Sequence, residues 1–191
     1  MTIRHERTAD IAAREALLDA SFGPGREAKT SERLREGRLP AEGLSFVATE
    51  RGRVVGTVRL WHITTGPGRP ALLLGPLAVD PDCRNRGLGA ALMERAIAEA
   101  RRRGHREILL VGDAPYYVRF GFSAAHAAGL SLPGPFERHR LLGLALVPDA
   151  AAKAVGLVRA TGIPAPGFAP VDIGAIRRNK AAKRSRLSHA A

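Results

Sequence analysis

The chain has 191 residues, of which 45% are hydrophobic and 25% charged, enough for one globular domain or one domain with a tail. This composition excludes a disulfide-stapled miniprotein and a wholly disordered chain, and the only cysteine, Cys83, excludes an intrachain disulfide and a cysteine zinc cage. The formal net charge of +12 would suggest an anionic partner if it were spread over a folded surface.

The first third of the chain predicts a strand, two helices and a β-hairpin. Apolar residues at helical spacing follow Thr8, a residue type that caps helices. The dipeptide Arg51-Gly52 separates two runs rich in Val and Thr, a pattern typical of a hairpin. We therefore expect a strand over residues 3–7, a helix from Thr8 to about Ser21, a short helix over residues 31–36, and hairpin strands over residues 44–49 and 53–63.

The middle of the chain predicts a buried strand followed by a long helix. Residues 71–79 are apolar throughout, as expected of a central strand buried on both faces, but Gly75-Pro76 interrupts the run. Because proline has no N–H for the strand ladder, we expect a β-bulge there. Residues 88–103 carry apolar side chains at helical spacing and end before Gly104, which predicts an amphipathic helix.

Two further strands and a short helix follow. We expect strands over residues 107–111 and 140–147, and a helix over residues 115–120 that Gly121 ends. The resulting order, β, α, α, β, β, β, α, β, α, β, predicts an α/β fold of the α+β type, built on a mixed sheet with helices.

The composition of the C-terminal segment does not favour nucleic-acid binding. Residues 161–170 are rich in Pro and Gly, which is typical of a linker, and residues 171–191 hold six basic residues against one acidic residue. No aromatic side chain in the tail can stack on bases, so we interpret it as a solvated flexible end. An apolar leader and long apolar runs are missing, which predicts a cytoplasmic protein without a membrane segment.

The turn between the central strand and the long helix carries the clearest binding motif. Gly87 and Gly89 leave consecutive N–H groups free to face a phosphate at the positive end of the helix dipole, and Arg84 and Arg86 add positive charge. The Lys-Ser/Thr pair of a Walker loop and the third glycine of the dinucleotide fingerprint are both missing. The turn therefore predicts a pyrophosphate site of another kind.

Two segments resemble the GNAT superfamily of acetyl-CoA-dependent N-acetyltransferases. Residues 77–92, LAVDPDCRNRGLGAAL, resemble the family's Q/R-x-x-G-x-G/A acetyl-CoA motif, and residues 116–122, YYVRFGF, resemble its Y-x-x-x-G-F element, most closely in a bacterial subgroup of predicted acetyltransferases. The resemblance implies a mostly antiparallel twisted sheet of about seven strands with a central β-bulge, flanked by helices. It also implies a single acetyltransferase domain over residues 1–160, with residues 161–191 as linker and basic tail.

The same resemblance assigns roles to individual residues. The bulge would separate its strand from residues 107–111 and open a slot for the thioester, while Leu77 and Val79 would pair with the pantetheine arm of coenzyme A. Tyr117 would protonate the leaving thiolate, with Tyr116 as the alternative acid. Main-chain N–H groups of Arg86, Gly87, Leu88, Gly89 and Ala90 would hold the pyrophosphate, with added charge from Arg84.

The implied reaction is the transfer of the acetyl group of acetyl-CoA to a primary amine by direct attack, without a metal. The acceptor would be a small molecule or a peptide, and the enzyme a homodimer; residues 20–43 and 123–139 show no acceptor-binding motif. A non-catalytic acyl-CoA-binding or nucleic-acid-associated module that uses the basic tail is the alternative. Besides ordered water, the candidates for the general base are Glu50, His62, Asp113 and His126.

Neither the cysteine nor the histidines indicate further chemistry. Cys83 lies near arginines that could lower its pKa, but it has no recognisable His-Asn partners. The six histidines show no paired metal-ligand spacing. We interpret residues 101–103, three arginines, as complementing the helix dipole rather than binding the 3′-phosphate of the cofactor.

Overall fold

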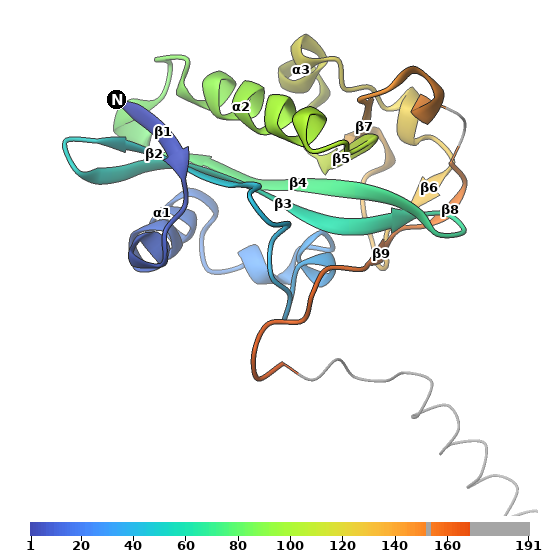
Figure 1. The fold of residues 1–191 in the computed structure, drawn as a ribbon, viewed down its shortest axis with the longest axis horizontal. Helices are drawn as coiled ribbons and strands as arrows, with labels where there is room; N and C mark the ends of the chain where they lie inside the picture. The colour runs from blue at the N-terminus through green and yellow to red at the C-terminus, as the bar shows by residue number, and fades with distance from the viewer. Residues whose placement is uncertain (152–153, 169–191) are drawn as a thin grey trace, which may run out of the picture.

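A seven-stranded sheet organises residues 1–151 and 154–168, the part of the chain that the computed structural model describes (Figure 1). The strands are β1 (Thr2–His5), β2 (Ser45–Glu50), β3 (Arg53–Thr65), β4 (Arg69–Val79), β5 (Glu107–Val111), β7 (Leu141–Ala145) and β9 (Arg159–Ala160). They lie in the order β1-β2-β3-β4-β5-β7, and β9 pairs with β3. Only the pair β4 and β5 is parallel among these neighbours. The predicted fold class, a mixed and mostly antiparallel sheet, is confirmed.

Helices cover both faces of this sheet. α2 (Leu88–Arg102) lies on one face, and α1 (Ile11–Phe22) with the short turns after it lies on the other (Figure 1). α3 (Ala114–Tyr117) follows β5 directly. The apolar residues predicted to form one face of α2, namely Leu88, Leu92, Met93, Ala96, Ile97 and Ala100, are all buried in the main core, so the amphipathic pattern is confirmed.

The remaining elements are short. A separate parallel pair joins β6 (Leu130–Ser131) to β8 (Gly156–Leu157). These two strands and β9 have two residues each, too few for a hydrophobic pattern, and the sequence did not predict them. The 3-10 turns span Thr8–Asp10, Arg26–Ala28, Glu32–Leu34, Pro81–Cys83, Val118–Phe120, Ala125–Ala127, Arg138–Arg140 and Pro148–Ala151.

Two local predictions near the N-terminus are wrong. Thr8 does not cap α1, because it begins the 3-10 turn Thr8–Asp10 that precedes the helix; Asp10 stands at the N-cap position and its side chain makes no capping hydrogen bond. Residues 31–36 form a 3-10 turn over Glu32–Leu34 instead of an α-helix. A segment of this length offers too few propagation steps to offset the cost of nucleating a helix.

The predicted bulge is present in β4. Val58 of β3 pairs with Leu77, whereas Leu60 pairs with Leu74, so the dipeptide Gly75-Pro76 faces a single residue of β3. The peptide bond of this dipeptide is cis. The extra residue turns β4 out of the regular ladder at this point.

Beyond the bulge β4 and β5 separate, as the resemblance implied. The two strands are paired only at Leu72 with Ile108 and at Leu73 with Leu109. β4 remains paired with β3 on its other side as far as Val79. In the described part of the chain, the β5-facing edge of β4 beyond Leu73 therefore has no strand partner, and an extended ligand can add to such an edge.

The chain after β9 continues along the domain. The N–H of Thr161 donates to the carbonyl of His62 at 3.1 Å, and the N–H of Ala165 donates to the carbonyl of Gly37 at 2.9 Å. The predicted basic tail, residues 171–191, lies outside the described residues.

Candidate active site

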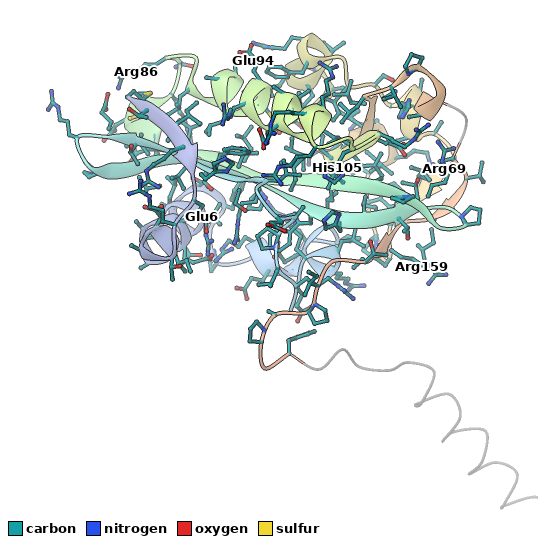
Figure 2. The ribbon with its side chains drawn as sticks, in the orientation of Figure 1. Glu6, Arg69, Arg86, Glu94, His105 and Arg159 are labelled. Carbon is teal, nitrogen blue, oxygen red and sulfur yellow. The ribbon has the colours of Figure 1, made fainter. Side chains whose placement is uncertain are left out.

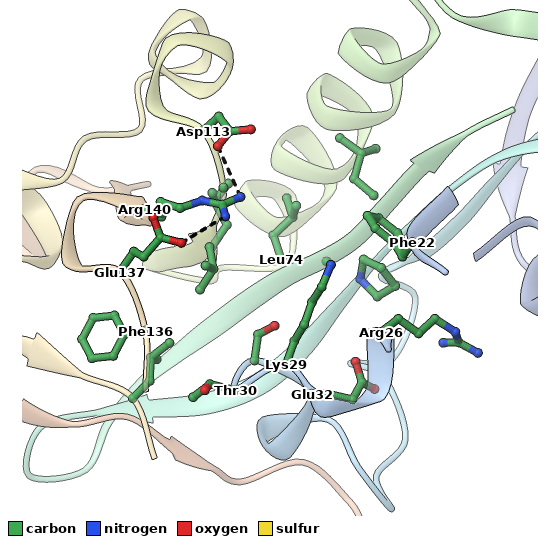
Figure 3. Close-up of a pocket in the computed structure, with 18 of the residues that line it drawn as sticks. Phe22, Arg26, Lys29, Thr30, Glu32, Leu74, Asp113, Phe136, Glu137 and Arg140 are labelled. Carbon is green, nitrogen blue, oxygen red and sulfur yellow. Dashed lines mark ion pairs between the residues drawn. The ribbon is translucent and has the colours of Figure 1, made fainter. Parts of the chain in front are cut away.

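A cavity of about 980 Å³ opens where β4 and β5 separate. It is lined by the bulge of β4, by the end of β5 with α3, and by two distant segments, residues 22–35 and 132–140 (Figure 3). A cavity of this size has room for small molecules. The predicted site residues that line it are Leu77, Arg84 and Tyr117, together with the alternative acid Tyr116.

The glycine loop presents main-chain donors at the start of α2. Gly87 is the N-cap and has a left-handed φ of 76°, which L side chains rarely adopt. The N–H of Ala91 makes the first helical hydrogen bond, to the carbonyl of Gly87 at 3.0 Å. The N–H groups of Leu88, Gly89 and Ala90 therefore precede the first donor of the helix, and they lie at the positive end of its dipole. This arrangement fits a phosphate group.

Glu50 binds the side chain of Arg86. Nη2 of Arg86 lies 2.8 Å from Oε1 of Glu50, and this hydrogen bond holds the pKa of the carboxyl below its ordinary value. Arg86 lies at the start of α2, at the opposite end of the sheet from Arg69 and Arg159 (Figure 2). Glu50 does not line the cavity, so it is not placed to act as a general base.

The hydroxyl of Tyr116 lies against the first turn of α2. A Cβ atom at position 89 would lie 2.7 Å from Oη of Tyr116, so Gly89 leaves room for this hydroxyl. The guanidinium of Arg119 lies over the Tyr116 ring, 4.9 Å from its centroid. Of the two tyrosines, Tyr116 thus contacts the glycine loop.

Tyr117 packs against the end of β5 instead. A Cβ atom at position 112 would lie 2.2 Å from Cε2 of Tyr117, so only Gly112 permits this position of the ring. The ring also lies edge-on to Phe122, with centroids 6.1 Å apart. Burial raises the pKa of Tyr117 to about 12, with further contributions from Tyr116 and Asp113, because a buried site disfavours the phenolate. The side chain is thus a protonated donor on the cavity wall.

Two of the predicted base candidates are held away from the cavity. The ring of His62 lies 5.6 Å from that of His105, which Figure 2 shows beyond the C-terminal end of α2. Nε2 of His126 lies 3.1 Å from Oε1 of the buried Glu107. Neither histidine lines the cavity, so neither is placed to receive the proton of an acceptor amine.

Asp113 is the one predicted base candidate on the cavity wall. Its Oδ1 lies 3.2 Å from Nη2 of Arg140, whose Nη1 lies 3.6 Å from Oε1 of Glu137 (Figure 3). Asp113 stands at the N-cap position of α3 but makes no capping hydrogen bond with its side chain. The structure therefore adds Glu137 to the carboxylates that face the cavity, in a segment where the sequence showed no motif.

A tryptophan of β3 bonds to the bulge of β4. Nε1 of Trp61 donates a 2.6 Å hydrogen bond to the carbonyl of Gly75, and the bond is buried. No sequence pattern signals this contact, because Trp61 and Gly75 belong to different strands and only the register of the sheet brings them together. Trp61 thus positions a main-chain group that lines the cavity.

The other residues singled out in the sequence carry no chemistry here. Burial raises the pKa of the Cys83 thiol and nearby Glu50 adds to the effect, and together they outweigh the lowering by Arg86. Among the described residues, no group of three or more His, Cys, Asp or Glu side chains could hold a metal ion. The same residues include no helix long and apolar enough to cross a membrane.

Comparisons with known proteins agree with the geometry. Residues 11–122 match the model of the acetyltransferase (GNAT) family. The chain is 35% identical over 153 residues to the uncharacterized N-acetyltransferase YhbS of Escherichia coli K12, and the match covers 76% of this chain and 90% of that protein. It is 32% identical over 127 residues to the uncharacterized N-acetyltransferase YjhQ of the same strain, covering 63% of this chain and 69% of that protein.

Solved structures give the same result. The crystal structure of Escherichia coli YhbS in complex with CoA has a TM-score of 0.71 and 32% identity, and covers 84% of this chain and 89% of that chain. A GNAT family acetyltransferase from Brucella melitensis in complex with acetyl-CoA has a TM-score of 0.63 and 30% identity, and the match covers 84% of this chain and 95% of that chain. The predicted family, fold class and enzyme class are confirmed. This chain belongs to the GNAT family of acetyltransferases.

Proposed function

We propose that this protein transfers the acetyl group of acetyl-CoA to a primary amine by direct attack of the amine on the thioester carbonyl. The observation that carries the proposal is the open edge of β4, which ends in a cavity lined by Tyr117. Two similar crystal structures contain CoA or acetyl-CoA, which supports the same co-substrate here. Membership in an acetyltransferase family disfavours the non-catalytic alternative.

The open edge of β4 suits the pantetheine arm, which can add to it as a strand does. Leu77 and Val79 lie on this part of β4 and would supply the main-chain partners. The pyrophosphate would then meet the main-chain N–H groups of Arg86, Gly87, Leu88, Gly89 and Ala90, with Arg84 adding charge from the cavity wall. With both ends held in this way, the thioester would lie next to the bulge of β4.

The residues around the cavity also suit the proton transfers of the reaction. The acceptor must lose its ammonium proton before it attacks, either to water or to Asp113 or Glu137 on the wall. As the C–N bond forms and the C–S bond breaks, the hydroxyl of Tyr117 would donate to the sulfur, and the proton that the nitrogen loses on becoming an amide would balance the proton that the sulfur takes up. The products are the acetylated amine and the free thiol of coenzyme A.

We extend the proposal to the organisation of the chain. Residues 1–160 would form the acetyltransferase domain, and residues 161–191 would follow as linker and tail. The hydrogen bonds of Thr161 and Ala165 attach the first part of that segment to the domain. The cytoplasmic location and the homodimer stay predictions.

Calorimetric titration with acetyl-CoA tests the proposal, at about 0.15 M salt so that the basic surface is screened. We expect saturable 1:1 binding, followed by turnover in a screen of amines. Gly89→Val would place a side chain at the main-chain donors and against the hydroxyl of Tyr116, and it should abolish binding without unfolding the protein. Ala98→Val, at an exposed position of the same helix, is the matched control and should bind normally. Undiminished affinity in Gly89→Val would contradict the phosphate site.

A further inference from the structure

Arg35 is a buried cation at the cavity. The residue is 9% exposed, and it lines the cavity from the position directly after the 3-10 turn Glu32–Leu34. A Cβ atom at position 75 would lie 4.0 Å from Nη1 of Arg35, so this nitrogen faces the bulge of β4. A guanidinium with so little access to water needs partners for its charge and for its five N–H donors.

The partners that Arg35 has within the described chain compensate it only in part. Nε donates to the carbonyl of Ser31 at 3.1 Å and Nη2 to the hydroxyl of the same residue at 2.7 Å, and both acceptors are neutral. Nη1 lies 3.4 Å from Oε2 of Glu32, a longer separation than in a strong charged hydrogen bond. Burial lowers the pKa of Arg35 and repulsion from Arg26 adds to the effect. Nη1, which also faces the bulge, has only this long contact with Glu32 as a partner among the described residues, so its other N–H can take an anion.

The same wall of the cavity carries another cation, Lys29, which has no carboxylate partner among the described residues. Arg26 is neutralised by Glu15 and by Asp19, whose Oδ1 lies 2.7 Å from Nε of the arginine. Within residues 1–151 and 154–168, no carboxylate lies within ion-pair distance of Lys29. Its Nζ lies 4.8 Å from the ring centroid of Phe22, and its side chain points into the cavity (Figure 3). Lys29 therefore adds attraction for anions to a wall that also carries the pair of Arg35 and Glu32.

The two segments that enclose this end of the cavity are joined to each other. The hydroxyl of Thr30 donates to the carbonyl of Pro135, and Nη1 of Arg33 donates to the carbonyl of Pro133 at 2.9 Å. These bonds connect residues about a hundred positions apart and bound the cavity on this side. Such a bounded cavity suits a small-molecule acceptor better than an acceptor residue inside a polypeptide chain.

We propose that the acceptor is a small amino carboxylate and that Arg35 binds its carboxylate. The inference rests on the proposed function, because the thioester would lie at the same bulge that Nη1 of Arg35 faces. The amine and the carboxylate must then be only a few bonds apart, as in an α- or β-amino acid. Arg35 is the specificity-determining residue, and Lys29 adds attraction at longer range.

Matched substrates test this inference in a thiol-release assay with acetyl-CoA. Alanine, β-alanine, leucine and phenylalanine are each compared with the decarboxylated amine, and alanine also with alaninamide, which keeps the size and loses the charge. We expect kcat/KM for the acids to exceed that for the uncharged partners by about 10- to 100-fold, the value of one charged hydrogen bond. Equal rates, or faster acetylation of the amines or of alaninamide, would overturn the inference.

Variants separate recognition from a structural role. Arg35→Gln should lower the ratio of kcat/KM between acid and amine by about 10- to 100-fold, and Arg35→Lys should restore part of it. A merely structural role would lower both rates equally and leave the ratio unchanged, which would refute the assignment. Arg7→Gln removes the same charge at an exposed position outside the cavity and should change nothing. Unchanged affinity for acetyl-CoA in Arg35→Gln shows that the variant is folded.

A binding measurement keeps the inference testable if no amine in the panel is acetylated. Trp61 is the only tryptophan and bonds to Gly75 at the bulge, so its fluorescence reports on this part of the cavity. N-acetylalanine, the product from alanine, should change the fluorescence saturably in wild type and not in Arg35→Gln, whereas N-ethylacetamide should not. No response to N-acetylalanine in a protein that acetylates none of the acids would overturn the inference. Failure to bind acetyl-CoA would instead overturn the proposed function.

Discussion

Tyr117→Phe removes one hydroxyl from the cavity and keeps the ring. The ring packs on Gly112 and lies edge-on to Phe122 and to Tyr116, with centroids 6.1 and 4.9 Å away, and phenylalanine preserves each of these contacts. The free energy of unfolding and the free energy of acetyl-CoA binding should each change by less than about 0.5 kcal/mol, about 2-fold in Kd. A loss of activity in this variant therefore reports on the hydroxyl alone.

The size of the loss follows from the acidity of the buried phenol. Its pKa is raised to about 12, chiefly by burial, while an ordinary thiol has a pKa of about 8.5. Complete transfer of the proton to the thiolate would thus be uphill by about 3.5 pKa units, about 5 kcal/mol. The hydroxyl therefore acts mainly as a hydrogen-bond donor to the developing charge. We expect kcat to fall about 10²-fold, at the lower end of the range for general acid catalysis.

The raised pKa also predicts how the effect depends on pH. Because burial disfavours the phenolate, Tyr117 keeps its proton at every pH well below about 12. The ratio of kcat between wild type and Tyr117→Phe should therefore be constant from about pH 6 to about pH 9. Thiol release at saturating acetyl-CoA measures kcat, and calorimetry measures Kd.

Tyr116→Phe is the matched control for this experiment. The hydroxyl of Tyr116 lies against Gly89 at the glycine loop, and we expect the Tyr116→Phe variant to lower kcat by less than about 5-fold. An unchanged kcat in Tyr117→Phe, or a larger loss in Tyr116→Phe than in Tyr117→Phe, would refute the assignment of the acid.

Three further predictions concern the support of the site and the stability of the fold. Trp61→Phe leaves the buried carbonyl of Gly75 without its donor, and urea denaturation followed by circular dichroism should show that the free energy of unfolding falls by about 1–3 kcal/mol. An unchanged free energy of unfolding would mean that this hydrogen bond does not stabilise the fold. Glu50→Gln frees the guanidinium of Arg86, so calorimetry at low salt should show up to about 5-fold tighter acetyl-CoA binding, and at high salt no difference; weaker binding would contradict this role. Hydrogen bonds from Arg102 and Arg103, at the C-terminal end of α2, lower the pKa of Glu99 from 4.5 to about 2, so the stabilising contribution of Glu99 is complete above pH 4.5 and is lost as the pH falls toward 2. Denaturation at pH 4.5 and near pH 2 should show that the free energy of unfolding falls less in Glu99→Gln than in wild type. Equal falls in the two proteins would refute the pairing of Glu99 with the two arginines.

Local sequence patterns determined the elements that carry cofactor chemistry. The apolar spacing of residues 88–103 fixed both the position of α2 and the face that it buries, because helical periodicity is a property of near neighbours. The pair Gly75-Pro76 predicted the bulge, since a missing N–H disrupts a ladder wherever the strand lies. The glycine loop likewise needs only its own residues to present N–H groups at a helix start.

Tertiary structure alone decided which side chains surround the acceptor end. Arg35 and Glu137 belong to segments without a recognisable motif, and they line one cavity because bonds such as that from Thr30 to Pro135 join residues 105 positions apart. The same holds for the base candidates: their residue types were suitable, but Glu50 pairs with Arg86 away from the cavity. Side-chain surroundings arise from the packing of distant segments, and a pattern of near neighbours has no information about which distant segments meet.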